Sequence, residues 1–202
     1  MIDDHAGFHD VNIAATMNAN VCPACDYLQD VYLSFFVDWL SDLTEKEEAR
    51  KDNALSYGLC PFHTWQMETM GSSLGISKGL SPLMRRIADE LQEVAKTQTK
   101  ASSVLGGFIN DSEKCRICRF VQTETSIYLV NLEKFLLFQD NRRLYETSGG
   151  LCLRHLYDMT KIADPQEIQF LSAFAAKHFA EIAADMDHYS EKRRSSQKHL
   201  LT

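Results

Sequence analysis

The chain is organised around Cys22-Pro23-Ala24-Cys25 and Cys60-Pro61-Phe62-His63, a C-x2-C motif and a C-x2-H motif separated by 34 residues. The pattern occurs once more, as Cys115-Arg116-Ile117-Cys118 and Cys152-Leu153-Arg154-His155, with 33 residues between its two motifs. All six cysteines of the chain lie in these motifs. Three cysteines and one histidine are a usual ligand complement of a tetrahedral zinc site. The sequence therefore predicts metal binding at both copies.

Each copy contains a complete ligand set, so we expect each to bind its own Zn2+, giving two ions per chain. The predicted ligands are Cys22, Cys25, Cys60 and His63 for the first site, and Cys115, Cys118, Cys152 and His155 for the second. The copies are offset by 93 residues at C-x2-C and by 92 at C-x2-H, and both contain the tripeptide Gly-Leu-Cys before the histidine. A constant offset of this kind indicates an internal duplication.

The spacing of apolar residues predicts helices. After Pro23, large apolar residues recur every three or four positions, which predicts a helix over 23–43, and a more polar helix is expected over 44–57. Two such helices form a hairpin that returns the C-x2-H motif towards the C-x2-C motif. No alternating apolar and polar pattern typical of a strand persists in the sequence. We therefore predict an all-α fold of two duplicated helical-hairpin repeats, each closed by a Cys3His metal site.

The predicted division of the chain follows the order of the motifs. It comprises a flexible N-terminus at 1–14, metal-binding helical repeat 1 at 15–108, metal-binding helical repeat 2 at 109–190 and a basic flexible tail at 191–202. Within the first repeat, the glycine- and serine-rich residues 71–81 are predicted to form a loop before a helix that opens at Pro82. Residues 97–113 are predicted to form a linker centred on Gly106-Gly107.

Composition restricts the function classes. The chain has 202 residues, 45% of them hydrophobic, and a formal net charge of -7. An acidic protein is a poor non-specific binder of nucleic acid, because that affinity depends on lysine and arginine neutralising phosphates. The first residues are acidic where a secretory signal is basic, and no apolar run reaches the ~18–20 residues of a membrane span. We expect a cytoplasmic protein that binds neither nucleic acid nor membranes, in which C-x2-C motifs indicate metal or redox chemistry.

The duplicated motifs built on Cys22, Cys60, Cys115 and Cys152 resemble those of a group of uncharacterised prokaryotic helical proteins with duplicated C-x2-C and C-x2-H motifs. The resemblance covers roughly residues 20–160 and implies no particular activity.

Our leading interpretation is a non-enzymatic zinc protein. Four protein ligands leave no open coordination position, whereas catalytic zinc normally keeps one for water or substrate. The two structural sites would then support a surface that binds a partner protein. One alternative is an iron–sulfur protein for electron transfer or cluster handling, because Cys3His can ligate a cluster. Another is a thiol/metal redox sensor, in which oxidation of the thiolates expels the metal. The exposure of the sulfur atoms would distinguish the sensor from a purely structural site.

Overall fold

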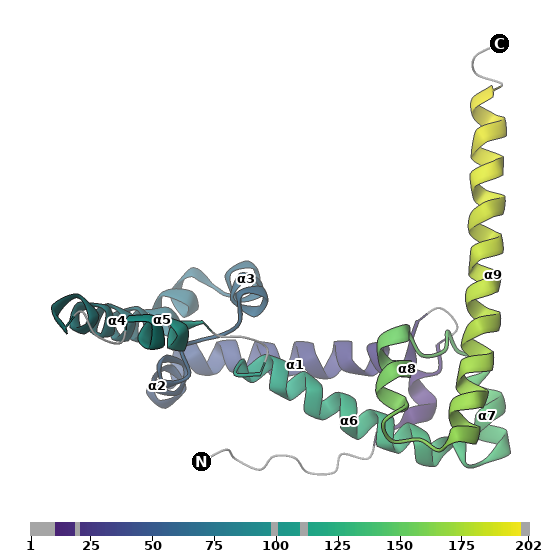
Figure 1. Ribbon diagram of the computed structural model, residues 1–202, viewed down its shortest axis with the longest axis horizontal. Coiled ribbons are helices and arrows are strands. Elements are labelled where there is room, and N and C mark those ends of the chain that lie inside the picture. The colour runs from purple at the N-terminus through teal and green to yellow at the C-terminus, as the bar shows by residue number, and fades with distance from the viewer. Residues whose placement is uncertain (1–10, 19–20, 98–100, 110–112, 199–202) are drawn as a thin grey trace. The chain divides into compact units, whose positions relative to one another are not determined.

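A computed structural model describes residues 11–18, 21–97, 101–109 and 113–198 of the chain (Figure 1). The regular structure of these residues is helical, without a strand, which confirms the predicted all-α class. The elements are η1 (Ile13–Thr16), α1 (Pro23–Glu45), α2 (Glu47–Leu55), α3 (Pro61–Met70), α4 (Ser73–Thr97), α5 (Ala101–Phe108), α6 (Arg116–Leu136), α7 (Gln139–Tyr145), α8 (Leu153–Met159) and α9 (Pro165–Lys198). Among these described helices, none combines the length and the apolar character that crossing a bilayer requires.

The chain forms two compact units, and neither corresponds to one sequence copy. Unit 1 comprises Met1–Tyr27 together with Thr125–Thr202, and unit 2 comprises Leu28–Glu124. The boundaries fall inside α1 and α6, so each long helix contributes its beginning to one unit and its remainder to the other. The predicted repeats at 15–108 and 109–190 divide the chain differently, because they follow the order of the motifs rather than the packing.

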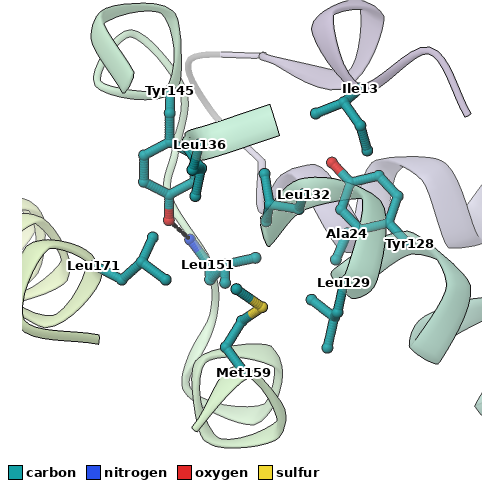
Figure 2. Packing of buried hydrophobic residues seen from close by; sticks show 10 residues of the cluster. All are labelled: Ile13, Ala24, Tyr128, Leu129, Leu132, Leu136, Tyr145, Leu151, Met159 and Leu171. Atoms are coloured by element: carbon teal, nitrogen blue, oxygen red, sulfur yellow. Dashed lines mark hydrogen bonds between the residues drawn. The ribbon is translucent and has the colours of Figure 1, made fainter. Parts of the chain in front are cut away.

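The core of unit 1 is built mainly from α6. Tyr128, Leu132 and Leu136 are fully buried, and side chains from α1, α8 and α9 pack around them (Figure 2). Figure 2 also shows the hydroxyl of the buried Tyr145 accepting a hydrogen bond from the Leu151 backbone N–H, at 2.9 Å. This bond gives two buried polar groups a partner inside the core.

Part of the predicted flexible N-terminus belongs to this core. Ile13 is 5% exposed and packs in the same cluster. Three residues later, the Thr16 hydroxyl lies 2.6 Å from the Tyr128 hydroxyl, and both residues are buried. Residues 11–14 are therefore held by apolar burial and do not form a flexible tail; residues 1–10 lie outside the described part of the chain.

Unit 2 repeats the core of unit 1 with residues of the other copy. Phe36, Trp39 and Leu43 of α1 are buried there, at positions 93 residues before Leu129, Leu132 and Leu136, which are buried in unit 1. The first turn of α6 completes the unit 2 core, because Ile117 is fully buried in the same cluster. Farther along α6, the ring of Phe120 stacks on that of Phe35, with centroids 3.9 Å apart. Buried core residues of the two units therefore recur at the same offset as the C-x2-C motifs.

The residues predicted as a loop at 71–81 are helical. Helix α4 begins at Ser73 and continues through Pro82, which lies inside it rather than at its start. The Ser72 hydroxyl accepts a hydrogen bond from the Gly75 backbone N–H, at 3.0 Å. The second copy has the same cap 92 residues later, where the Asp164 carboxylate accepts from the Glu167 backbone N–H at 2.8 Å. The predicted loop over 71–81 is therefore wrong, and this segment matches the start of α9 in the second copy.

Close packing explains why a segment rich in glycine is helical here. A Cβ atom at Gly79 would lie only 3.0 Å from the Leu43 side chain, so the missing side chain lets α4 approach the end of α1 closely. The amide of the buried Asn53 in α2 also donates a hydrogen bond to the Gly79 carbonyl, at 3.2 Å. Tertiary contacts thus override the low helix propensity of glycine.

Two further segments contain more helix than predicted. The predicted linker 97–113 includes the short helix α5, and the ring of Phe108 at its end lies 5.5 Å from that of Tyr57. The predicted flexible tail 191–202 is helical as far as Lys198, where α9 ends, and residues 199–202 lie outside the described part of the chain. Figure 1 shows α9 as the longest helix of unit 1.

One buried charge in unit 1 leads to a prediction about pH. Glu167 is 1% exposed, and neither carboxylate oxygen has a hydrogen-bond partner among the described residues. Burial, together with the nearby charges of Glu133 and Asp164, raises the pKa of Glu167 from 4.5 to about 7. Between these two values the unfolded chain has lost the proton that the folded chain still binds. The free energy of unfolding must therefore fall as the pH rises through this window.

We predict that Glu167→Gln removes this dependence. Relative to the unsubstituted protein, the variant should gain on the order of 2–3 kcal/mol at pH 8, at ~1.4 kcal/mol per pKa unit, and little at pH 4.5. Denaturant titrations of both proteins from pH 4.5 to 8 provide the difference curve, in which other titrating groups cancel. Exposed Glu146→Gln is the matched control and should give a flat difference. A flat curve for Glu167→Gln as well would contradict the raised pKa.

Candidate metal centres

The eight predicted ligands gather in two groups, but with partners exchanged between the copies. Each group combines a C-x2-C motif of one copy with the C-x2-H motif of the other, and its ligand atoms all lie within 4.8 Å of one another. Site 1 consists of Cys22, Cys25, Cys152 and His155, and site 2 of Cys60, His63, Cys115 and Cys118. The expectation that each copy closes on its own ligands is therefore wrong. The crossing keeps each site within a single unit, site 1 in unit 1 and site 2 in unit 2.

In site 1 the histidine lies against all three sulfur atoms. The His155 Nδ1 atom is 3.4 Å from the Cys22 Sγ, 3.6 Å from the Cys25 Sγ and 3.4 Å from the Cys152 Sγ. The Cys25 and Cys152 sulfurs are 4.0 Å apart.

Site 2 has the same arrangement. The His63 Nδ1 atom is 3.2 Å from the Cys60 Sγ and 3.4 Å from the sulfurs of both Cys115 and Cys118. The Cys60 and Cys118 sulfurs are 3.7 Å apart. In both sites the ligand atom that faces the sulfurs is Nδ1.

These separations match the edges of a coordination tetrahedron. A zinc ion with bonds of ~2.3 Å to sulfur and ~2.0–2.1 Å to nitrogen requires sulfur–nitrogen edges of about 3.5 Å and sulfur–sulfur edges of about 3.8 Å. A disulfide would require ~2.05 Å between sulfurs, and all six cysteines are free. Both groups therefore have the donor atoms and the spacing to hold one tetrahedral metal ion each.

Helix starts place the ligands of each motif together. Cys60 is the N-cap of α3 and Cys152 is the N-cap of α8, with almost identical backbone angles (φ -65°, ψ 161° and φ -65°, ψ 162°). Cys22 and Cys115 directly precede α1 and α6 and accept their first backbone hydrogen bonds, from Asp26 and from Arg119, each at 3.0 Å. Since the second ligand follows three residues later, one helical turn brings both onto the same side.

Backbone N–H groups also support one sulfur in each site. The Cys22 sulfur accepts hydrogen bonds from the backbone of Cys25 and Cys152, and the Cys115 sulfur accepts from Cys118 and Cys60. In both cases one donor comes from the cysteine's own motif and the other from the partner motif. Sequence motifs alone did not reveal these donors, because they depend on which motifs meet.

The sulfur atoms repel one another's charge. Burial and the neighbouring sulfurs raise the pKa of the Cys25 thiol to about 12, and the same causes raise the pKa of Cys118 to about 12. Burial also lowers the pKa of His155, which favours the neutral imidazole that a metal binds. At Cys115 burial is outweighed by hydrogen bonding to His63 and to the backbone, so its pKa is lowered. A bound cation would offset the repulsion and release the remaining protons.

An aromatic side chain that the motifs did not identify borders site 2. The ring of Tyr32 lies 6.0 Å from that of His63, and its hydroxyl donates a 2.5 Å hydrogen bond to Gln66. Burial and the charges of the site 2 cysteines raise the pKa of Tyr32. At sequence level the only signal was the position of Tyr32 on the apolar stripe of the predicted helix 23–43, which indicated core packing.

Comparison with known proteins identifies a family and little else. A family model described as a family of unknown function (DUF6062) matches residues 10–197, and this span includes both sites. No curated protein and no solved structure matches the chain.

Crossed pairing makes a prediction that paired substitutions can test. Cys22→Ala with Cys152→Ala removes two ligands of site 1 only, so the chain should retain one metal ion. Cys22→Ala with Cys60→Ala damages both sites, so both ions should be lost. Elemental analysis of the purified, metal-reconstituted variants measures the metal content per chain.

Pairing within each copy would reverse the two results, so the experiment distinguishes the two arrangements. Cys60→Ala with Cys118→Ala is the matched pair for site 2 and should also leave one ion. Circular dichroism checks that the variants that retain one ion have kept their helices.

Proposed function

Because the chain belongs to DUF6062, a family of unknown function, we propose its function from the two Cys3His groups themselves. The protein is a non-enzymatic zinc protein, in which two structural ions hold helix starts in place and so organise a surface for a partner protein.

One observation carries the structural role. Each group supplies four ligand atoms at tetrahedral spacing from the protein itself. A zinc ion bound this way has no position left for water or substrate, which is the arrangement of structural rather than catalytic zinc. The ion would connect the start of a long helix to the start of a short one, α1 to α8 in unit 1 and α6 to α3 in unit 2.

The spacing of the sulfurs supports a single ion over an iron–sulfur cluster. A cluster places several iron and sulfide atoms between its ligands, so the ligand sulfurs stand farther apart than around one ion. Here all four ligand atoms of each site lie within 4.8 Å of one another, and the Cys25–Cys152 and Cys60–Cys118 sulfurs, at 4.0 Å and 3.7 Å, agree with the ~3.8 Å edge of one zinc tetrahedron.

The short helices that carry the ligand histidines also carry exposed apolar side chains. On α3, Phe62 and Trp65 are 60% and 61% exposed. On α8, Leu153 and Tyr157 are 69% and 61% exposed, and Tyr157 stands 92 residues after Trp65. Large aromatic side chains at such positions are typical anchors of protein interfaces. These residues form one exposed apolar patch in each unit, next to that unit's proposed metal ligands, and we assign each patch to contact with a protein partner; the two patches are called the interaction surface below.

Metal analysis tests the identity of the ion. Protein purified without oxygen should be colourless and contain two zinc atoms per chain. Iron and inorganic sulfide, with absorption in the visible range, would instead identify the cluster protein and remove the structural zinc interpretation.

The interaction surface can be tested separately. Phe62→Ser with Trp65→Ser should abolish the capture of a specific partner from the source cells while leaving the zinc content unchanged. Leu55→Ser, in the same unit, replaces a side chain that is 66% exposed outside this surface and should retain the partner. Equal capture by all three proteins would remove this surface from the proposal.

We predict that removing the metal opens the core of unit 2. Trp39 is 5% exposed and packs in the cluster that includes Cys60 and Cys115, whereas the second tryptophan, Trp65, is exposed. In the Trp65→Phe variant, fluorescence therefore reports on Trp39 alone. A strong zinc chelator should shift its emission to longer wavelength, and added zinc should restore it.

The Trp39→Phe variant is the matched control, because the remaining Trp65 is already in contact with water and its emission should move little. Melting curves of the same samples should show a lower transition temperature without metal. Unchanged emission and melting after complete metal removal would exclude a structural role for site 2.

A further inference from the structure

We propose that site 1 is a site of oxidative modification, at which hydrogen peroxide or a related two-electron oxidant joins Cys25 to Cys152 in a disulfide and releases the metal. Site 2 keeps its metal under the same conditions. This inference rests on the proposed function, since it requires two sites that each hold a single ion.

The two sites have the same ligands but differ in burial. In site 1 all three cysteines are partly exposed, whereas in site 2 Cys60 is 7% exposed, Cys115 is fully buried and only Cys118 is partly exposed. Oxidation of a thiolate depends on access as well as on its ionisation. A bound metal ion would keep the sulfurs of both sites as thiolates. The two sites therefore differ in how easily an oxidant reaches their cysteines.

Local charge favours site 2, because Arg119 directly follows Cys118 whereas Asp26 directly follows Cys25, so the preference for site 1 rests on access alone. Each site has an arginine inside one of its motifs, Arg154 in site 1 and Arg116 in site 2, and both side chains are exposed. Positive neighbours favour reactive thiolates, and this influence is present at both sites.

The distances in site 1 indicate which sulfurs would join. Cys25 and Cys152 lie 4.0 Å apart and are both partly exposed, so either can meet the oxidant first. The corresponding pair in site 2, Cys60 and Cys118, is slightly closer at 3.7 Å, but Cys60 is a buried residue. Proximity alone would therefore favour site 2, and access favours site 1.

The reaction balances with peroxide as the oxidant. One thiolate attacks a peroxide oxygen, the O–O bond breaks, and the sulfur becomes a sulfenic acid while hydroxide leaves. The second thiolate then attacks that sulfur, the S–S bond forms, and a second hydroxide leaves. The two sulfurs lose two electrons in total, and the peroxide becomes two water molecules after protonation. The metal, left with Cys22 and His155 as its only protein ligands, is released.

The modification would act where α8 begins. Cys152 is the N-cap of α8 and directly precedes the exposed Leu153 of the interaction surface. Exchanging a tetrahedral ion for a disulfide of ~2.05 Å must draw the starts of α1 and α8 together and free His155. Oxidation would therefore alter the part of the proposed surface that lies in unit 1.

The experiment follows metal release and disulfide formation in the same samples. Zinc-loaded protein is treated with increasing hydrogen peroxide, released zinc is measured with a colorimetric chelator, and disulfides are mapped by mass spectrometry. We expect one zinc atom per chain to be lost first, together with a Cys25–Cys152 disulfide, while the second zinc atom stays bound. Loss of both ions together, or a Cys60–Cys118 disulfide first, would overturn the proposal.

Two matched variants identify the sensitive site independently. His63→Ala leaves only site 1 intact and should lose its remaining zinc at a peroxide dose that spares the remaining zinc of His155→Ala. If a variant fails to fold, disulfide mapping in the unsubstituted protein still decides the question. The zinc content before oxidation distinguishes a failure of the proposed oxidation site from a failure of the proposed zinc-binding function. Two ions without preferential loss would contradict only the oxidation site, and a protein without zinc would contradict the proposed function.

Discussion

Four protein atoms can hold one ion only if they converge to within about 4 Å, and this constraint acts here on motifs far apart in the chain. Site 1 joins Cys25 to a cysteine 127 residues away, and site 2 joins Cys60 to one 58 residues away. Closing each copy on itself would join cysteines only 35 and 34 residues apart. At ~0.6 kcal/mol per doubling of loop length, crossed closure costs roughly 1.5 kcal/mol more in chain entropy than closure within each copy.

Burial of a single large apolar side chain, worth ~1.5–3 kcal/mol, offsets that cost. Ile117 is one such side chain, because it is buried among α1 residues of the other copy.

The comparison of crossed pairing with pairing inside each copy also explains which features of the sites could be predicted from the sequence. The eight cysteine and histidine residues of the two groups could be selected from the sequence, because side-chain packing alone gives cysteine and histidine no reason to recur at one-turn spacing. That they bind metal stays a prediction. The pairing of the motifs could not be predicted, because the motifs are interchangeable. Cys60 and Cys152 have the same backbone conformation, and each C-x2-C motif opens a long helix. The spacing of the motifs therefore fits either pairing. Which motifs meet is decided by the side chains buried beside them. Sequence periodicity shows which face of a helix these side chains occupy, but not which helix they pack against.

The errors in the predicted fold have a related origin. Residues 71–81 were predicted as a loop because glycine and serine are poor helix formers, yet at Gly79 the missing side chain is what allows close contact with Leu43. Aligning Ser72 with Asp164 as equivalent caps would have exposed the error, since the offset of 92 residues continues through both. In contrast, the helix predicted over 23–43 agrees with α1, because its apolar stripe is long and regular. Local composition failed where packing between helices determined the structure.

The two units are not equivalent at matching positions. Position 75 in unit 2 is a glycine, whereas the corresponding position in unit 1 is Glu167, whose buried carboxylate lacks a partner among the described residues. The site 1 cysteines are also the more exposed ones. A unit that contains an uncompensated buried charge has less stability to lose. With one ion bound at each site as proposed, unit 1 should therefore depend more on its ion than unit 2 does, and the ligands around that ion would be the more accessible ones. Two sites with the same donor atoms can in this way differ both in the accessibility of their cysteines and in the stability of the unit around them.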